Sequence, residues 1–181
     1  MKNIIIILSL FIGWSSFSQS EENPDRILTY GLPNYNYRKA MEFVGKEWGI
    51  ELYPVAGCMV SRKLVDSVKA VHKKLWKKMD SIHGIDSEEQ FRKETKIEMK
   101  RVIEVWKVFE SDRQIKKRRK IIERKKEDTL ATLDSISSSG IIYYWTIFSF
   151  EKDNNPEFKW EPEFKVGVNL STGKLEILEQ E

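Results

Sequence analysis

The sequence predicts an α+β fold: a three- to four-stranded antiparallel sheet packed on one face by helices, with a long charged helical hairpin. Three observations predict it. Apolar residues recur every three or four positions from 64 to 82, as on one face of a helix. Residues 141–150 are apolar on both alternating sides, as in a central strand. Residues 164–178 alternate around Ser171-Thr172-Gly173, which indicates a hairpin.

The N-terminus has the pattern of an export signal. Lys2 precedes an apolar run that starts at Ile4, and Ser16 and Ser18 fit the positions around a cleavage site. The run is shorter than the roughly 20 apolar residues that a membrane span needs. We therefore expect residues 1–19 to be a signal peptide, and the protein to be exported, periplasmic or extracellular, and soluble after signal cleavage. A buried first helix or strand is the alternative.

The rest of the chain is expected to form one domain. Residues 20–35 contain Pro24, Gly31 and Pro33, and we interpret them as a flexible lead-in. Residues 36–181 are predicted to be a single α+β domain.

The first elements of that domain are short. Asn36 precedes an amphipathic helix that ends at Trp48, with Gly49 as its stop signal. A strand over 50–55 follows. Because Pro54 has no N–H to donate, this strand should end there or lie at a sheet edge.

Two longer helices come next. Ser61 is a good N-cap for the helix that Gly84 closes. Ser87-Glu88-Glu89-Gln90 is a capping-box pattern, and helical residues continue to about Asp128 or beyond. The pair is rich in charge, as is typical of a helical hairpin or coiled coil.

The apolar stripe of the second long helix changes sides near its middle. Phe91 and Val102 share one side, whereas Ile115 and Ile122 lie about 150° away on the helical wheel. We predict a bend or break at residues 110–114. An unbroken helix whose second half docks on a partner is the alternative.

The C-terminal third is expected to be three strands. Serines and Gly140 connect the last helix to the strand at 141–150, and residues 151–162 form a polar loop. The hairpin around Gly173 then completes the sheet.

Composition excludes several classes of protein. Hydrophobic residues are 40% and aromatic residues 12% of the 181, too many for a disordered chain. A single cysteine excludes an intramolecular disulfide and Cys₂ or Cys₄ metal sites, and two histidines disfavour a multi-histidine metal centre. Phosphate loops, nucleophile elbows and HExxH motifs are missing from the sequence. We expect no catalytic residues, no metal and no cofactor.

The net charge of +3 conceals one strongly basic segment, residues 113–126. It contains nine basic residues and one acid: Arg113, Lys116, Lys117, Arg118, Arg119, Lys120, Arg124, Lys125 and Lys126, with Glu123. Such a helix could bind anionic lipid or lipopolysaccharide. We favour a solvated helix face whose acid partners lie on the acidic C-terminal sheet. Nucleic acid is not expected as a partner, because aromatic residues for base stacking are not interleaved.

Cys58 and the two histidines are the candidate reactive groups of the chain. A buried, inert Cys58 is favoured, since free cysteine is among the most buried residue types. A thiol with enhanced reactivity beside the next helix, or pairing with another molecule, are the alternatives. A dyad with His72 is excluded if the helix is as predicted, because about 16 Å of helix separates them. His72 is expected to be a packed structural histidine, and His83 to sit in the last helical turn.

Residues 40–84 resemble the FEKKY domain of Bacteroidetes proteins. The resemblance lies in Gly45-Lys-Glu-Trp-Gly-Ile50, in Gly57-Cys58, and in the helix Leu64-Val-Asp-Ser-Val-Lys-Ala-Val-His-Lys-Lys-Leu75. Trp48 takes the place of the family's tyrosine and His72 falls near its asparagine, while the aromatic after the closing glycine is missing. The resemblance implies no activity. The C-terminal hairpin is similar to the closing hairpin of PepSY-type exported domains.

These observations lead to three functional hypotheses. The first is an exported, non-catalytic domain that acts through contacts with an unknown protein partner. The second is an envelope-surface binder that uses the basic helix 113–126 on anionic lipid or lipopolysaccharide. The third is a thiol-dependent enzyme that uses Cys58.

Overall fold

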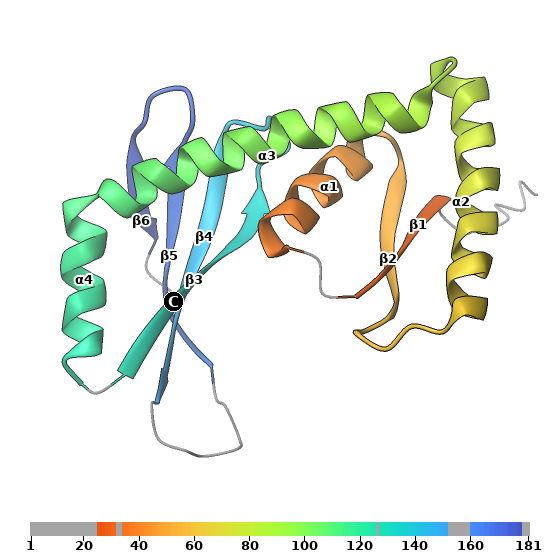
Figure 1. Cartoon of the computed structure of the whole chain (residues 1–181). Coiled ribbons are helices and arrows are strands. Elements are labelled where there is room, and N and C mark those ends of the chain that lie inside the picture. Colours follow the sequence, from red (N-terminus) through yellow and green to blue (C-terminus); the bar gives the residue numbers. More distant parts are fainter. Residues whose placement is uncertain (1–24, 32–33, 126, 152–159, 179–181) are drawn as a thin grey trace, which may run out of the picture.

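The computed structural model describes residues 25–31, 34–125, 127–151 and 160–178. The predicted signal peptide, residues 1–19, lies outside them. The described part forms an α+β fold with a two-stranded and a four-stranded sheet, as Figure 1 shows, so the predicted fold class is confirmed. In chain order the elements are β1 (Asp25–Tyr30), α1 (Tyr35–Glu47), β2 (Ile50–Ala56), α2 (Arg62–His83), α3 (Ser87–Ser111), α4 (Arg113–Glu123), β3 (Glu127–Ile136), β4 (Ile142–Glu151), β5 (Glu161–Asn169) and β6 (Leu175–Leu178).

The N-terminal part is a β-α-β unit in which β1 and β2 pair in parallel across α1. The expectation of a flexible lead-in is therefore wrong for residues 25–30. Ile27 is buried there, and the row of backbone groups along β2 supplies hydrogen bonds that local sequence does not reveal. The predicted strand at 50–55 is confirmed as β2, which carries Pro54 at a sheet edge. The helix starts two residues earlier than expected, because Asn34 and not Asn36 caps it.

Helix α2 begins and ends as predicted. The Ser61 hydroxyl accepts the Leu64 N–H, and Gly84 closes the helix at φ 101°. The capping box predicted at Ser87 does not form. Asp86 is instead the residue before the helix, the Ser87 N–H donates to Oδ1 of Asp80, and the Ser87 hydroxyl donates to the Gly84 carbonyl. These bonds fix the corner between α2 and α3.

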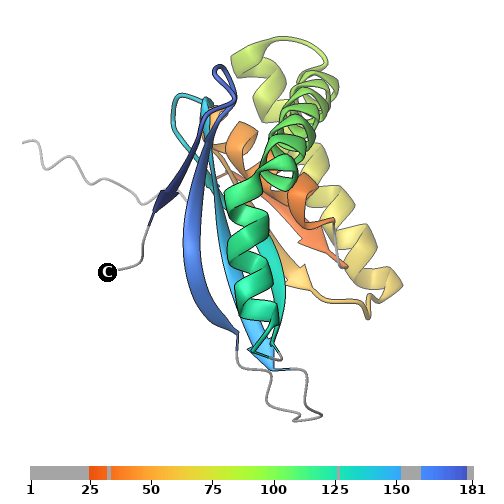
Figure 2. The ribbon, with the colours of Figure 1, turned by 90° about the vertical axis from the view of Figure 1, so that its left-hand side faces the viewer.

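The predicted break at residues 110–114 is confirmed. Asp112 adopts an extended backbone between α3 and α4, and its Oδ1 accepts the N–H groups of Gln114 and Ile115. The alternative of an unbroken helix is wrong. The break turns α4 down along the face of the four-stranded sheet (Figure 2).

The expectation that the helix continues to about residue 128 or beyond is also wrong, because residues 127–136 form β3. Thr129, Leu133 and Ile136 are spaced as on a helix, but threonine and isoleucine suit strands equally well. A long-range contact makes this segment a strand. β4 is apolar on both faces, and β3 pairs with one of its two edges.

The four-stranded sheet has the antiparallel order β3-β4-β5-β6, with β4 inside it as predicted. The predicted hairpin is confirmed as β5 and β6, with Gly173 at φ 64°. One face of this sheet packs against α4 and the second half of α3. Their shared core is built from Val102, Val105, Phe109, Ile115, Ile122, Leu133, Tyr143, Trp145, Ile147, Phe164, Val166 and Val168.

A second core lies where α1, α2 and the start of α3 meet β1 and β2. It is built from Ile27, Val44, Trp48, Ile50, Leu75, Met79 and Phe91. Helix α3 thus contributes to both cores. In Figure 1, α2 and α3 meet at a corner and run in different directions, so the predicted long charged hairpin and coiled coil are not supported.

Within the described ranges, none of the helices is both long and apolar enough to span a membrane.

Candidate functional site

The basic segment forms helix α4, and its side chains divide between two sides. Ile115 and Ile122 are buried against the sheet. Five exposed basic residues lie opposite them, within an arc of about 100° at 100° per residue. We call these five the cationic face: Arg113, Lys116, Lys117, Lys120 and Arg124.

Two of the predicted binding residues turn toward the protein instead. Arg119 donates from Nε to the Thr129 hydroxyl and from Nη1 to Oε1 of Glu110 at 2.9 Å. The Arg118 guanidinium lies 5.6 Å from the centre of the Phe164 ring. These two arginines therefore hold α4 on the sheet. Lys125 is exposed just beyond the helix, and Lys126 lies outside the described residues.

The cationic face has no acid partners among the described residues. No hydrogen bond or ion pair joins its five side chains to any other described residue. Glu123, the acid within the segment, accepts a hydrogen bond from the Thr129 hydroxyl at 3.2 Å. We expected acids of the C-terminal sheet to pair with this helix. That expectation is wrong for these five residues, because only the buried side of α4 contacts the sheet.

Cys58 is exposed, so the expectation that it is buried is wrong. It lies between β2 and α2, next to Met59, which is 93% exposed. This segment runs along the surface because Gly57 and Cys58 bend the chain away from the core before Ser61 starts the next helix.

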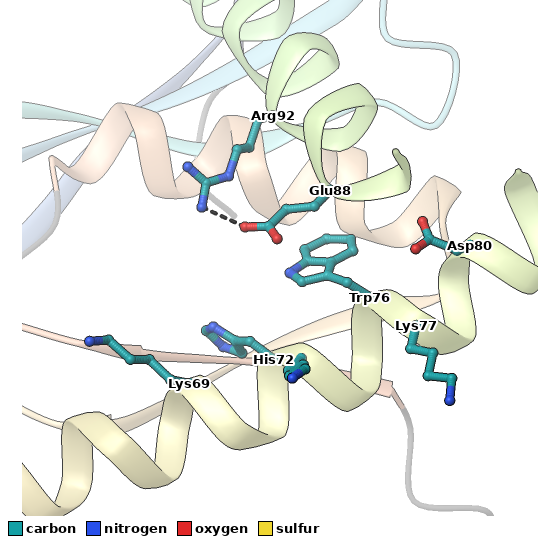
Figure 3. A pocket seen from close by; sticks show the side chains of 8 residues that line it. Lys69, His72, Trp76, Lys77, Asp80, Glu88 and Arg92 are labelled. Atoms are coloured by element: carbon teal, nitrogen blue, oxygen red, sulfur yellow. Dashed lines mark hydrogen bonds and ion pairs between the residues drawn. The ribbon is translucent and has the colours of Figure 1, made fainter. Parts of the chain in front are cut away.

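Sequence reasoning missed a groove between α2 and α3. Its volume is about 580 Å³, and an adjoining hollow of about 510 Å³ shares four of its residues. Figure 3 shows residues of α2 along its floor, with Glu88 and Arg92 facing them from α3. The lining residues are Lys69, His72, Lys73, Trp76, Lys77, Asp80, Glu88 and Arg92.

Spacing along α2 could have indicated one wall of this groove. Lys69, Lys73, Trp76 and Asp80 are separated by three or four positions, so they share one side of the helix. The other wall depends on the corner at Gly84, which places the start of α3 over these residues.

His72 packs in this groove, as the prediction of a structural histidine required. Its Nε2 accepts the Leu28 N–H at 3.0 Å, which ties α2 to β1. Burial lowers the pKa of His72 below 6.5, and the negative charge of Glu88 opposes that shift. A neutral imidazole whose Nε2 accepts a hydrogen bond carries its proton on Nδ1. His83 lies in the last turn of α2, 4.4 Å from the Trp48 ring.

In the described part of the chain, no group of three or more histidine, cysteine, aspartate or glutamate residues is arranged to hold a metal ion. Comparison of the chain with protein-family models, with curated proteins and with solved structures gives no match. The resemblance of residues 40–84 to the FEKKY domain therefore stays a prediction.

Proposed function

We propose that this protein is exported and binds anionic phospholipid surfaces through the cationic face of α4. The observation that supports the proposal is the set of five exposed basic side chains without acid partners among the described residues. A helix already folded against the sheet presents them together, so binding would not require the segment to order itself.

The expected strength follows from electrostatics. A lysine or arginine close to an anionic membrane contributes about 1 kcal/mol, so five contribute at most about 5 kcal/mol. This attraction weakens as salt screens it. Binding should therefore be moderate, reversible and strongly dependent on ionic strength.

Export is the second part of the proposal, and it rests on the apolar run after Lys2 and on Ser16 and Ser18. N-terminal sequencing of the protein purified from its natural source tests it. Finding that the chain starts near residue 20 is the expected result, and finding Met1 still attached would overturn it.

Co-sedimentation with vesicles tests membrane binding. The purified protein without residues 1–19 is mixed with phosphatidylcholine vesicles, or with the same vesicles containing phosphatidylglycerol, at low and moderate salt. We expect binding only to the vesicles with phosphatidylglycerol, and less of it at the higher salt concentration. Binding that is absent, or that does not respond to salt, would contradict the proposal.

Two variants of equal charge locate the binding surface. Lys116→Glu with Lys120→Glu reverses two charges on the cationic face, and should abolish binding. Lys96→Glu with Lys100→Glu makes the same change on exposed residues of α3, also four positions apart, and should leave most of the binding. Equal losses would show that net charge, and not α4, governs binding.

One observation favours contact with a protein as a second candidate function. The face of β4 away from the helices carries Tyr144, Phe148 and Phe150, which are only partly buried. Leu130 of β3, opposite Phe148, is 42% exposed. Phe148 and Phe150 also contact the Trp160 ring, which is 46% exposed. Exposed apolar patches are typical of protein contact sites, and most soluble oligomers are two-fold homodimers, so a second copy of this chain is the partner we propose.

Sedimentation velocity over a range of concentrations tests this candidate. We expect a dimer that Phe148→Lys converts to a monomer, while Ile85→Lys, the same kind of change at an 89% exposed residue between α2 and α3, leaves it unchanged. A monomer at all concentrations would contradict it.

A further inference from the structure

Hydrogen-bond donors gather at one end of the groove between α2 and α3. Lys69 and Lys73 are exposed there, and within the described part of the chain neither has a side-chain partner. Trp76 is partly exposed, and its indole N–H has no acceptor among the described residues. His72 adds its Nδ1–H, because its Nε2 accepts the Leu28 N–H. These donors are therefore open to solvent and available to an acceptor that enters the groove.

The acids of the groove do not supply it. Oδ1 of Asp80 accepts the Ser87 N–H at 3.0 Å, and Oε1 of Glu88 accepts from Arg92 at 2.6 Å. Figure 3 shows the Glu88 carboxylate within the groove, paired with Arg92. Among the described residues, no ion pair joins Asp80 or Glu88 to Lys69 or Lys73, and the groove lining has four basic residues against these two acids.

We propose that this groove binds a small molecule with a carboxylate or phosphate group next to a flat ring. The oxyanion would accept hydrogen bonds from Lys69, Lys73 and the Nδ1–H of His72. The ring would lie against Trp76, which is partly exposed one turn further along α2, as Figure 3 shows. The volume of about 580 Å³ is within the range of small-molecule sites.

The distribution of charge also limits the size of the ligand. Asp86 and Glu89 line the adjoining hollow, and a longer polyanion that extended past Trp76 would meet their negative charges. A compact monoanion or dianion avoids this repulsion. The site lies at the opposite end of α3 from α4, so it is independent of the proposed membrane surface.

An NMR titration of the ¹⁵N-labelled protein tests the proposal, with phenyl phosphate as the probe. The indole signal of Trp76 is assigned with the Trp76→Phe variant, and the ring nitrogens of His72 with His72→Gln. We expect saturable shifts of both signals. Benzyl alcohol, which has the ring without the charge, should give no saturable shift, and inorganic phosphate should bind more weakly than phenyl phosphate.

A pair of matched variants separates this site from α4. Lys69→Ala with Lys73→Ala should weaken binding about tenfold or more, because it removes two charge-assisted contacts. Lys116→Ala with Lys120→Ala removes the same charge from the cationic face and should leave the Trp76 titration unchanged. The proposal would be overturned by the absence of saturation, by equal shifts with benzyl alcohol, or by unchanged affinity in the Lys69 and Lys73 variant when its spectrum shows a folded protein.

Discussion

The hydroxyl of Tyr143 donates a 2.6 Å hydrogen bond to Oε1 of Glu98, whose side chain is almost completely buried. Oε2 of the same carboxylate accepts a hydrogen bond from Nη1 of Arg101 at 3.1 Å. This contact joins the middle of α3 to β4, at the core that the four-stranded sheet shares with α3 and α4. It satisfies an acid that would otherwise be costly to bury.

Removing the hydroxyl should therefore destabilise the fold. Tyr143→Phe leaves Glu98 with one donor fewer, and we expect a loss of about 1–3 kcal/mol in the free energy of unfolding. Urea denaturation measures it. Tyr144→Phe is the matched control, since Tyr144 lies on the outer side of β4 and has no hydrogen-bond partner among the described residues. Similar losses in the two variants would show that the bond to Glu98 contributes little.

The same pair predicts how stability changes at alkaline pH. Burial, then the hydrogen bond to Glu98 and its negative charge, raise the pKa of Tyr143 above the ordinary value of 10. Above pH 10 the unfolded chain loses this proton and the folded protein keeps it, so stability falls as the pH rises. Urea titrations on both sides of pH 10 should show a smaller decline in Tyr143→Phe. An identical decline in the variant would refute this origin.

His72 predicts the opposite dependence at acid pH. Because burial lowers its pKa below 6.5, the unfolded chain binds a proton before the folded protein does. The contribution of His72 to stability is complete above pH 6.5 and is lost as the pH falls below that value. Protonated Nε2 can no longer accept the Leu28 N–H. His72→Gln keeps an acceptor but does not titrate, so its unfolding free energy should fall less between neutral pH and about pH 5. A decline as steep as that of the parent protein would contradict this role.

Gly45 should not tolerate a side chain. A Cβ atom at this position in α1 would lie 2.7 Å from the carbonyl oxygen of Ile50, which is backbone and cannot turn aside. We expect Gly45→Ala to cost about 1–3 kcal/mol, as overpacking does. Gly57→Ala is the control, because nothing lies within 4 Å of a Cβ there. Thermal unfolding compares the two variants, and equal midpoints would show that α1 shifts freely over β2.

The exposure of Cys58 predicts rapid labelling of the native protein. Iodoacetamide should modify the folded chain at a rate close to that of the denatured chain, as mass spectrometry can follow. Labelling that requires denaturation would contradict the position of this residue. Labelling much faster than in the denatured chain would favour the thiol-dependent hypothesis.

Elements with strong local signals were predictable from the sequence. Ser61 and Gly84 mark the two ends of α2 by their own chemistry, and Gly173 marks the hairpin turn. The break after Ser111 was visible as a change in the side on which apolar residues lie. In each case the deciding interactions are within a few residues of one another.

Two strands were missed because their partners are distant in the sequence. β1 has only six residues, and its hydrogen bonds go to β2, beyond a whole helix. β3 follows the basic helix directly, and its threonines and isoleucine fit a helical stripe until β4 pairs with it. Residue propensities alone did not distinguish a strand from a flexible segment at residues 25–30, or a strand from a helix at residues 127–136.

The candidate site was predictable only in part. The composition of residues 113–126 identified the basic helix, but not the inward turn of Arg118 and Arg119 toward Phe164, Thr129 and Glu110. The groove beside Trp76 depends on the angle between α2 and α3, which the corner at Gly84, Asp86 and Ser87 sets. The angle between α2 and α3 cannot be deduced from the residue pattern of either helix alone.

Helix α3 supplies Phe91 to one apolar cluster and Val105 and Phe109 to the other. The N-terminal and C-terminal halves of the protein therefore cannot be expressed as separate folded fragments. Each fragment would lack part of the helix that completes its apolar core. A proteolytic cut within this helix would open both interiors together. Heating should accordingly melt the protein in one cooperative step and not half by half.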